Sequence, residues 1–232
     1  MTAILKLLLG GVGVAVLLTL LSPVSLAVEQ TSEGEVEQSR VPYYLLRPDL
    51  RHCGSPLCGG YWIEAVNQKL SHCADGERRE TCYVADVDWQ AIGLDGTEGS
   101  TLVQGRQHMK EFPGFGSVSV LLPEAAYRPA TSVEARGRWY GLGHNGVVCV
   151  THPCFDIDER VLNRSDEEVI SAVDLNGVGA NPDDMEAAHR SLFQGELIAV
   201  GQNVIDPDQG PAGAGITLVA SLFFLRIHSE AE

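Results

Sequence analysis

The chain has 232 residues, of which 44% are hydrophobic, so it can bury a substantial apolar core. It contains 16 Lys and Arg against 31 Asp and Glu, a net charge of −15, which opposes binding to phosphate backbones and to anionic lipid. We therefore expect no nucleic-acid partner, whereas cationic partners and metal ions are compatible with this charge.

Residues 1–27 have the pattern of a secretory signal peptide. Lys6 precedes an apolar run from Leu7 to Leu21, and Ser25 and Ala27 supply the small residues of a cleavage site. An uncleaved anchor is the alternative, because about fifteen apolar residues almost span a bilayer. We expect cleavage, which removes Lys6 and changes the net charge from −15 to −16. No later segment is long and apolar enough to be transmembrane.

The rest of the chain divides into two copies of one unit. We assign residues 28–40 to a flexible polar tail, 41–131 to the first β-rich repeat, 132–228 to the second and 229–232 to a frayed end. Both copies share the frame Tyr-x8-Cys-x4-Cys-x8-Asn, which runs from Tyr44 to Asn67 and again, 96 residues later, from Tyr140 to Asn163. Matched pairs resume at Asp88 and Gly93 with Asp174 and Gly179, and at Gly99 and Gly105 with Gly195 and Gly201. Such self-similarity indicates internal duplication.

Changes of offset between the copies locate two insertions. The first copy has extra residues between Asn67 and Asp88, and the second has extra residues between Gly179 and Gly195. The second insertion begins Asn-Pro-Asp-Asp, with a capping residue, a proline suited to the first helical position, and acids facing the positive end of the helix dipole. This pattern predicts a helix over about 182–193.

Six cysteines allow 15 pairings. Cysteines that arrive with a duplicated unit or an insertion are expected to pair within it. The predicted disulfides are therefore Cys53–Cys58, Cys73–Cys82 and Cys149–Cys154. Each closes a short loop, which by chain entropy stabilises the fold by roughly 2–3 kcal/mol.

Strand patterns dominate elsewhere. Apolar residues alternate with period 2 over 83–89 and 169–175, and further strands are indicated near 102, 198, 118–122 and 216–225. The predicted fold is mainly β with a short helix: two tandem five-stranded OB-like barrel units, because a helix between the third and fourth of five strands is the order of that barrel. The alternative is one β-sandwich built from both copies.

Four blocks carry a family resemblance: RPDLRHCGSPLCGGYWIEAVN, SHCADGERRETCYVADVD, HNGVVCVTHPCFDIDERVLN and ISAVDLNGVGA. They resemble an uncharacterised domain-of-unknown-function family of secreted bacterial proteins, over roughly residues 42–226. The resemblance implies export and disulfides. It implies no assigned activity and offers no catalytic residue to carry over.

Metal binding is the main alternative to the disulfides. Tetrahedral zinc could be held by nitrogen and sulfur from two clusters, His52, Cys53, Cys58, His72, Cys73 and Cys82, and His144, Cys149, His152 and Cys154. Export to an oxidising compartment and cysteine spacings of four and eight favour disulfides. The acidic segment 206–210 is typical of a hairpin turn rather than a calcium loop. We assign no metal, cofactor or catalytic residue.

The two Cys-x4-Cys loops remain as candidate binding sites, because a loop closed by a disulfide loses less entropy on binding. Their candidate contact residues are Ser55, Pro56 and Leu57, and Thr151, His152 and Pro153. The alternative is that they are tight turns braced for stability. We expect a non-enzymatic module, either envelope-associated or binding a partner protein in the periplasm, at the cell surface or in the medium, with a protease inhibitor as one version. A secreted hydrolase using clustered carboxylates or a divalent metal is the competing class.

Overall fold

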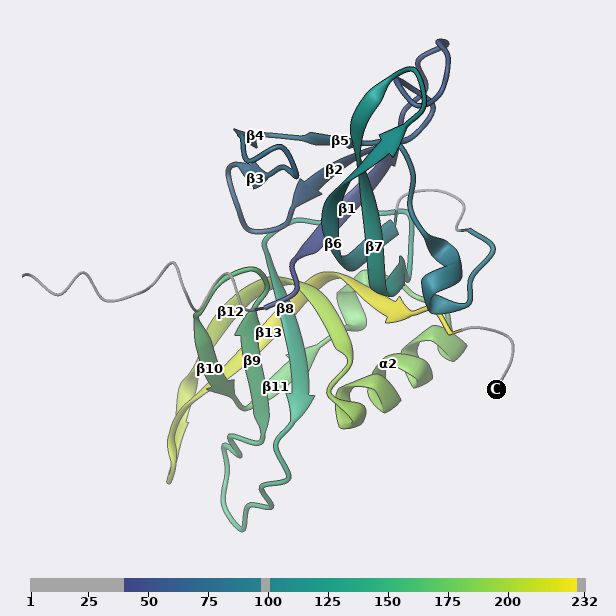
Figure 1. Cartoon of the computed structure of the whole chain (residues 1–232). Coiled ribbons are helices and arrows are strands. Elements are labelled where there is room, and N and C mark those ends of the chain that lie inside the picture. The colour runs from purple at the N-terminus through teal and green to yellow at the C-terminus, as the bar shows by residue number, and fades with distance from the viewer. Residues whose placement is uncertain (1–39, 97–100, 229–232) are drawn as a thin grey trace, which may run out of the picture. The chain divides into compact units, whose positions relative to one another are not determined.

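The computed structural model describes residues 40–96 and 101–228 (Figure 1). The expected signal peptide and the C-terminal residues 229–232 lie outside the described residues, as does the expected tail up to residue 39. Arg40, which the sequence assigns to that tail, contacts the second half of the chain: its Nη2 donates to Glu167 Oε1 at 2.7 Å.

The described chain forms thirteen strands, two 3-10 turns and one α-helix. The first half contains β1 (Tyr43–Pro48), β2 (Tyr61–Ala65), β3 (Ser71–His72), β4 (Arg78–Arg79), β5 (Cys82–Val84), η1 (Trp89–Ile92), β6 (Thr101–Phe112) and β7 (Gly116–Pro129). The second half contains β8 (Arg138–His144), β9 (Ile157–Val161), β10 (Glu167–Ile170), β11 (Ala172–Asp174), η2 (Asn176–Val178), α2 (Pro182–Gln194), β12 (Leu197–Gly210) and β13 (Gly213–Arg226).

Eleven strands form one sheet in the order β10-β9-β8-β12-β13-β7-β6-β1-β2-β5, with β11 paired in parallel to β13 off this path. The fold is therefore mainly β, as the sequence predicts. The expected closed barrels are not found among the described residues, because the path is open at β10 and β5. Within residues 40–96 and 101–228 the strands also do not divide into two large sheets, as the sandwich alternative requires, since the second sheet found there is the β3–β4 hairpin.

The two halves have the same strand order, which is β5-β2-β1-β6-β7 in the first and β10-β9-β8-β12-β13 in the second. They meet where β7 and β13 pair antiparallel, residues 127–129 facing residues 224–226. The register also corresponds: Leu46 faces Ile63 on β1 and β2, and Leu142 faces Glu159 on β8 and β9. Strand positions in one half can therefore be compared directly with positions in the other.

Helix α2 forms where its capping sequence predicts. The Asn181 side chain accepts a hydrogen bond from the Asp184 backbone N–H, and Gly195 ends the helix at φ 74°. Ala188 is buried, and the helix contacts β8, β12 and β13. Asp184 is also buried and pairs with Arg128 of β7, so this ion pair connects the helix to the first half.

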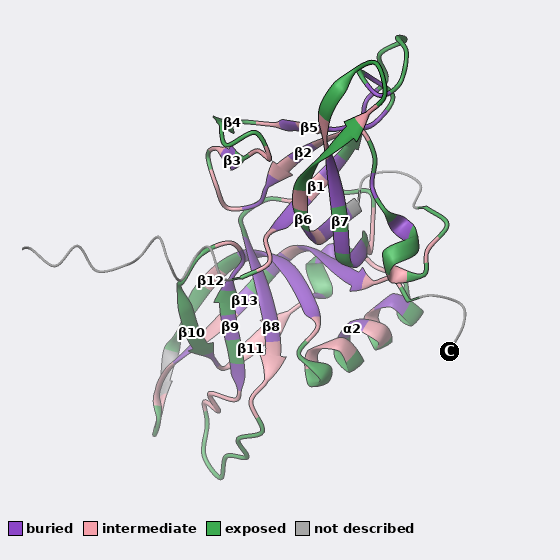
Figure 2. Ribbon diagram, viewed as in Figure 1, coloured by how far each residue is buried: buried purple, intermediate pink, exposed green. Residues whose placement is uncertain are grey.

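Buried residues concentrate along the strands (Figure 2). One apolar cluster belongs to the first half and includes Ile63 and Leu121, both fully buried. A larger cluster surrounds Phe223 in the second half and also takes in Tyr43 and Leu102 from the first. Burial of the apolar side chains in these two clusters is the main force that stabilises such a sheet.

Candidate functional site

Every cysteine of the chain is in a disulfide, and the pairs are Cys53–Cys58, Cys73–Cys82 and Cys149–Cys154. These are the pairs expected from the repeat frame. The middle pair closes the β3–β4 hairpin, and the other two close the first cysteine loop (residues 53–58) and the second cysteine loop (residues 149–154). Both loops contain a cis X-Pro peptide, at Ser55-Pro56 and His152-Pro153.

The first cysteine loop is held by hydrogen bonds to its own half. The Tyr83 hydroxyl donates to the Pro56 carbonyl at 3.0 Å, and Arg51 Nη2 donates to the Leu57 carbonyl at 3.1 Å. The Arg51 guanidinium also lies over the rings of Trp62 and Tyr83, at 5.0 and 5.4 Å. These contacts fix the loop backbone against β2 and β5.

Asp49 explains why Arg51 stays in this position. Its side chain is almost completely buried, and Arg51 contacts both oxygens, with Nε 2.9 Å from Oδ1 and Nη2 2.8 Å from Oδ2. Hydrogen bonds from Arg51 lower the pKa of Asp49 to about 2. The ion pair is thus charged at neutral pH and orients the guanidinium toward the loop.

The second cysteine loop has a braced base. His144 Nε2 lies 3.3 Å from Asp156 Oδ2, and the Asn145 N–H donates to the Asp156 carbonyl at 2.9 Å. The His144 ring packs against Phe193 of α2 with a centroid distance of 5.1 Å. A Cβ at Gly210 on β12 would lie 2.2 Å from the His152 carbonyl oxygen, so strand and loop backbones touch there.

The tip of the second loop is apolar and open to solvent. Val148 is 90% exposed, Val150 is fully exposed and Val147 is about half exposed. Three exposed valines within four residues differ from the scattered single apolar residues that soluble proteins normally show. No sequence pattern singled them out, because a valine-rich segment next to a strand indicates a further strand as readily as an exposed tip.

The six candidate contact residues differ in exposure. Ser55, Leu57, Thr151 and His152 are exposed, and Pro153 is partly exposed. Pro56 is buried, and the role of the six residues as contacts stays a prediction.

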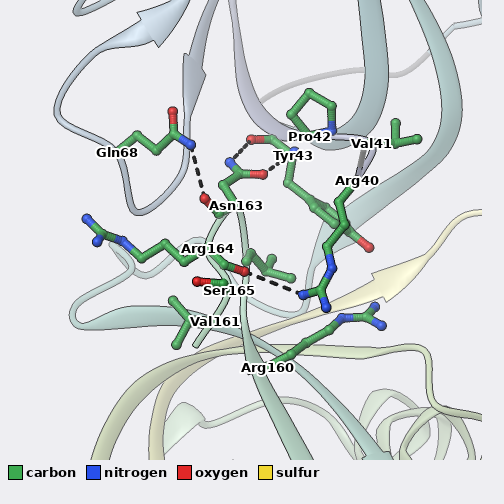
Figure 3. A pocket seen from close by; sticks show the side chains of 11 residues that line it. Arg40, Val41, Pro42, Tyr43, Gln68, Arg160, Val161, Asn163, Arg164 and Ser165 are labelled. Atoms are coloured by element: carbon green, nitrogen blue, oxygen red, sulfur yellow. Dashed lines mark hydrogen bonds between the residues drawn. The ribbon is translucent and has the colours of Figure 1, made fainter. Parts of the chain in front are cut away.

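The junction between the halves is built on two asparagines, Asn67 and Asn163, and Figure 3 shows Asn163 with its partner Tyr43. Asn163 Oδ1 accepts from the Tyr43 N–H, and its Nδ2 donates to the carbonyls of Tyr43 and Val66. Asn67 makes the same three bonds to Trp139 and Leu162. About 60 Å³ of space remains between the side chains around Asn163, so the two halves pack closely there. The sequence places both asparagines at the end of the repeat frame without indicating this role.

A cleft of about 250 Å³ lies in the second half. Its lining includes Arg138, Tyr140, Glu159, Glu167, Glu168 and Asn203, and we call it the Glu159 cleft. Glu159 is only 3% exposed, and its Oε1 accepts from Asn203 Nδ2 at 2.8 Å. Burial raises the pKa of its carboxyl, and the charge of Glu168 adds to this effect. Within the described part of the chain, no group of three or more His, Cys, Asp or Glu side chains is placed to hold a metal ion.

No helix among the described residues has the length and hydropathy needed to cross a membrane. Comparison with curated proteins gives no match, and comparison with solved structures gives none either. One family model matches residues 42–230, which is most of the chain and includes all three disulfides and both clusters of buried side chains. The chain therefore belongs to the family described as a domain of unknown function, DUF6748.

Proposed function

We propose that this protein is a non-enzymatic binding module that contacts a partner protein through the apolar tip of its second cysteine loop. The observation that carries the proposal is the group of exposed valines, Val147, Val148 and Val150, on a loop closed by the Cys149–Cys154 disulfide. Exposed apolar groups that gather in one place are characteristic of interaction surfaces.

The energetics of such a contact are favourable. Burying one valine side chain contributes on the order of 1.5–3 kcal/mol, so two or three of them supply a useful part of a binding free energy. The disulfide and the His144–Asp156 contact at the loop base limit the backbone entropy that would be lost on binding.

A protein groove suits this tip better than a lipid surface. The chain carries a net charge of −15, which repels the anionic lipids that attract peripheral proteins. The tip itself also lacks the Trp, Phe, Lys and Arg residues typical of membrane-interface anchors, since its sequence is Val-Val-Cys-Val-Thr-His. A protease inhibitor is one form of such a module, because it also presents a rigid loop to a complementary groove.

The test compares three forms of the protein: wild type, the double variant V148S/V150S and the control V133S. Val133 is an exposed valine outside the cysteine loops. Each form, checked for unchanged folding by circular dichroism, is incubated with envelope and medium fractions of the producing cell and chemically cross-linked. We expect one partner to be captured by wild type and by V133S, and at least tenfold less of it by V148S/V150S. Equal capture by all three forms contradicts the proposal.

We also propose that the protein is exported and that its two halves derive from duplication of an OB-like unit. Three disulfides support an oxidising compartment. The shared strand order supports the duplication, and the parallel pairing of β11 with β13 supports the OB-like order. N-terminal sequencing of protein from the periplasm or medium tests the export, with Val28 as the expected first residue. A mature protein that begins at Met1 contradicts it.

A further inference from the structure

We propose that the Glu159 cleft is a binding site for a primary ammonium group, carried by a free diamine or by a lysine side chain. The juxtaposition that leads to this inference is a pair of buried oxygens without a hydrogen-bond donor, Glu159 Oε2 and Asn203 Oδ1. The two side chains are already joined to each other, because Asn203 Nδ2 donates to Glu159 Oε1. This site is separate from the valine tip of the second cysteine loop.

Unpaired buried oxygens are costly, which makes this pair unusual. A buried acceptor that lacks a donor costs about 1–3 kcal/mol, and more when it is charged. Glu159 is buried on the same face of β9 as Ile157 and Val161, which lie on either side of it and are both apolar. An apolar residue in place of Glu159 would fill the same space without leaving a buried oxygen unpaired.

The first half of the protein carries such a residue. Leu46 of β1 faces Ile63 of β2, and at the corresponding position Leu142 of β8 faces Glu159 of β9. Ile63 is fully buried in the first-half core. The same architecture is therefore stable with isoleucine at this position, so the structure does not require the carboxylate of Glu159.

Charge in the cleft favours a cation. Four lining residues are acidic, Asp166, Glu167, Glu168 and Glu159, and one is basic, Arg138. Glu168 faces Glu159 directly in the β10–β9 register. A cation placed between them reduces this like-charge repulsion. The acidic residues other than Glu159 are exposed, and Glu167 is paired with Arg40.

The pattern of acceptors selects an ammonium among the possible cations. A guanidinium binds best to both oxygens of one carboxylate, but Asn203 already occupies Oε1 of Glu159. An ammonium is a compact charge that takes single oxygens from separate groups. Calcium needs six to eight oxygens, and among the described residues no group of three or more His, Cys, Asp or Glu side chains is placed to hold a metal ion.

The experiment titrates the full chain with butylamine hydrochloride at constant ionic strength, following Asn203 side-chain amide shifts by NMR and heat by calorimetry. We expect saturable binding that moves the Asn203 signal. In E159Q the affinity is expected to fall at least tenfold, and E159I is expected to fold normally and not to bind. The control E64Q changes an exposed carboxylate of β2 and is expected to bind like wild type.

Two further probes distinguish the sources of the ammonium. Tighter binding of 1,4-diaminobutane than of an Nα-acetyl-lysine amide indicates a free diamine, and the reverse order indicates a lysine side chain. Either order supports the site. Preference for methylguanidine or for calcium over butylamine, unchanged affinity in E159I, or no saturable binding to wild type overturns it.

Discussion

Asn67 and Asn163 exchange equivalent hydrogen bonds across the junction between the two halves. Each asparagine belongs to one half and bonds to backbone groups of the other, with Asn67 reaching Trp139 and Asn163 reaching Tyr43. Both have positive φ, 58° and 60°, a conformation that asparagine tolerates better than most residues. Asparagine thus both tolerates the positive φ at these positions and supplies the side-chain amide that bonds to the other half.

Replacing either asparagine by alanine is expected to lower the free energy of unfolding by about 2–4 kcal/mol, because buried backbone partners lose their bonds and alanine is strained at positive φ. Replacement by glycine removes the side-chain hydrogen bonds, but glycine adopts positive φ without strain. N163G is therefore expected to be less destabilised than N163A. Urea unfolding measures both. N176A, which alters an exposed asparagine bonded to Asp174, serves as the control. Equal stability of N163A and N176A would contradict this account of the junction.

Replacing Glu159 by isoleucine is expected to stabilise the protein. The change removes a buried carboxylate oxygen that has no partner, for a gain of about 1–3 kcal/mol. In a protein of this size that corresponds to a rise in Tm of roughly 2–12 °C, measurable by calorimetry. A lower Tm for E159I than for wild type would show that the carboxylate has a structural role.

The Glu159 contribution also depends on pH. Because its folded-state pKa is raised, the folded protein takes up this proton more readily, so stability falls as pH rises from the unfolded-state pKa through the folded-state pKa. E159Q is expected to lack this fall. Urea midpoints of wild type and E159Q, measured from pH 4 to pH 8, provide the comparison, and parallel pH profiles for the two proteins would refute the expectation.

Asp49 is expected to have the opposite pH dependence. Hydrogen bonds from Arg51 lower its pKa from 3.8 to about 2, so its stabilising effect is complete at neutral pH and disappears as pH falls through about 2. The difference in urea midpoint between wild type and D49N is expected to be constant down to about pH 4 and to close below it. A difference that is as large at pH 2 as at pH 7 would mean that the ion pair is not its source.

A substitution at Gly210 of β12 can displace the second cysteine loop while the sequence of the loop stays the same. A Cβ at this position would lie 2.2 Å from the His152 carbonyl oxygen, so G210A is expected to displace the loop base. We expect faster amide exchange confined to the loop and reduced partner capture. G54A is the control, because a Cβ at Gly54 meets nothing within 4 Å. Unchanged capture by G210A would argue that loop position does not matter for binding.

Local signals in the sequence predicted much of this fold. Helix α2 begins at its Asn-Pro-Asp-Asp cap, and the disulfides join the cysteines that the sequence pattern paired, Cys53–Cys58, Cys73–Cys82 and Cys149–Cys154. Long-range features were harder to predict. The expected turn at 206–210 lies within β12, where the register is irregular between Ile205 and Gln209, and the strand ends only at Gly210. Pairing with β13 extends the strand there despite a local sequence that favours a turn.

The candidate sites were only partly visible in the sequence. The Cys-x4-Cys spacing identified both loops but not that the second exposes three valines where the first exposes Leu57, because the exposure of a side chain depends on how its loop packs against the rest of the fold. Glu159 had a detectable signal, since it interrupts the alternation of Ile157 and Val161 and occupies the position of Ile63 in the other half. The residues around Asn203 in the chain gave no indication that its side chain would lie beside Glu159.

The β7–β13 pairing and the asparagine exchange do not depend on a continuous chain between the halves. Two fragments, ending and starting near residue 132, should therefore recognise each other when expressed separately and reassemble as a heterodimer. Peptide-bond continuity would then serve mainly to keep the fragments at high effective concentration. Such complementation would make the protein a ready basis for a split reporter.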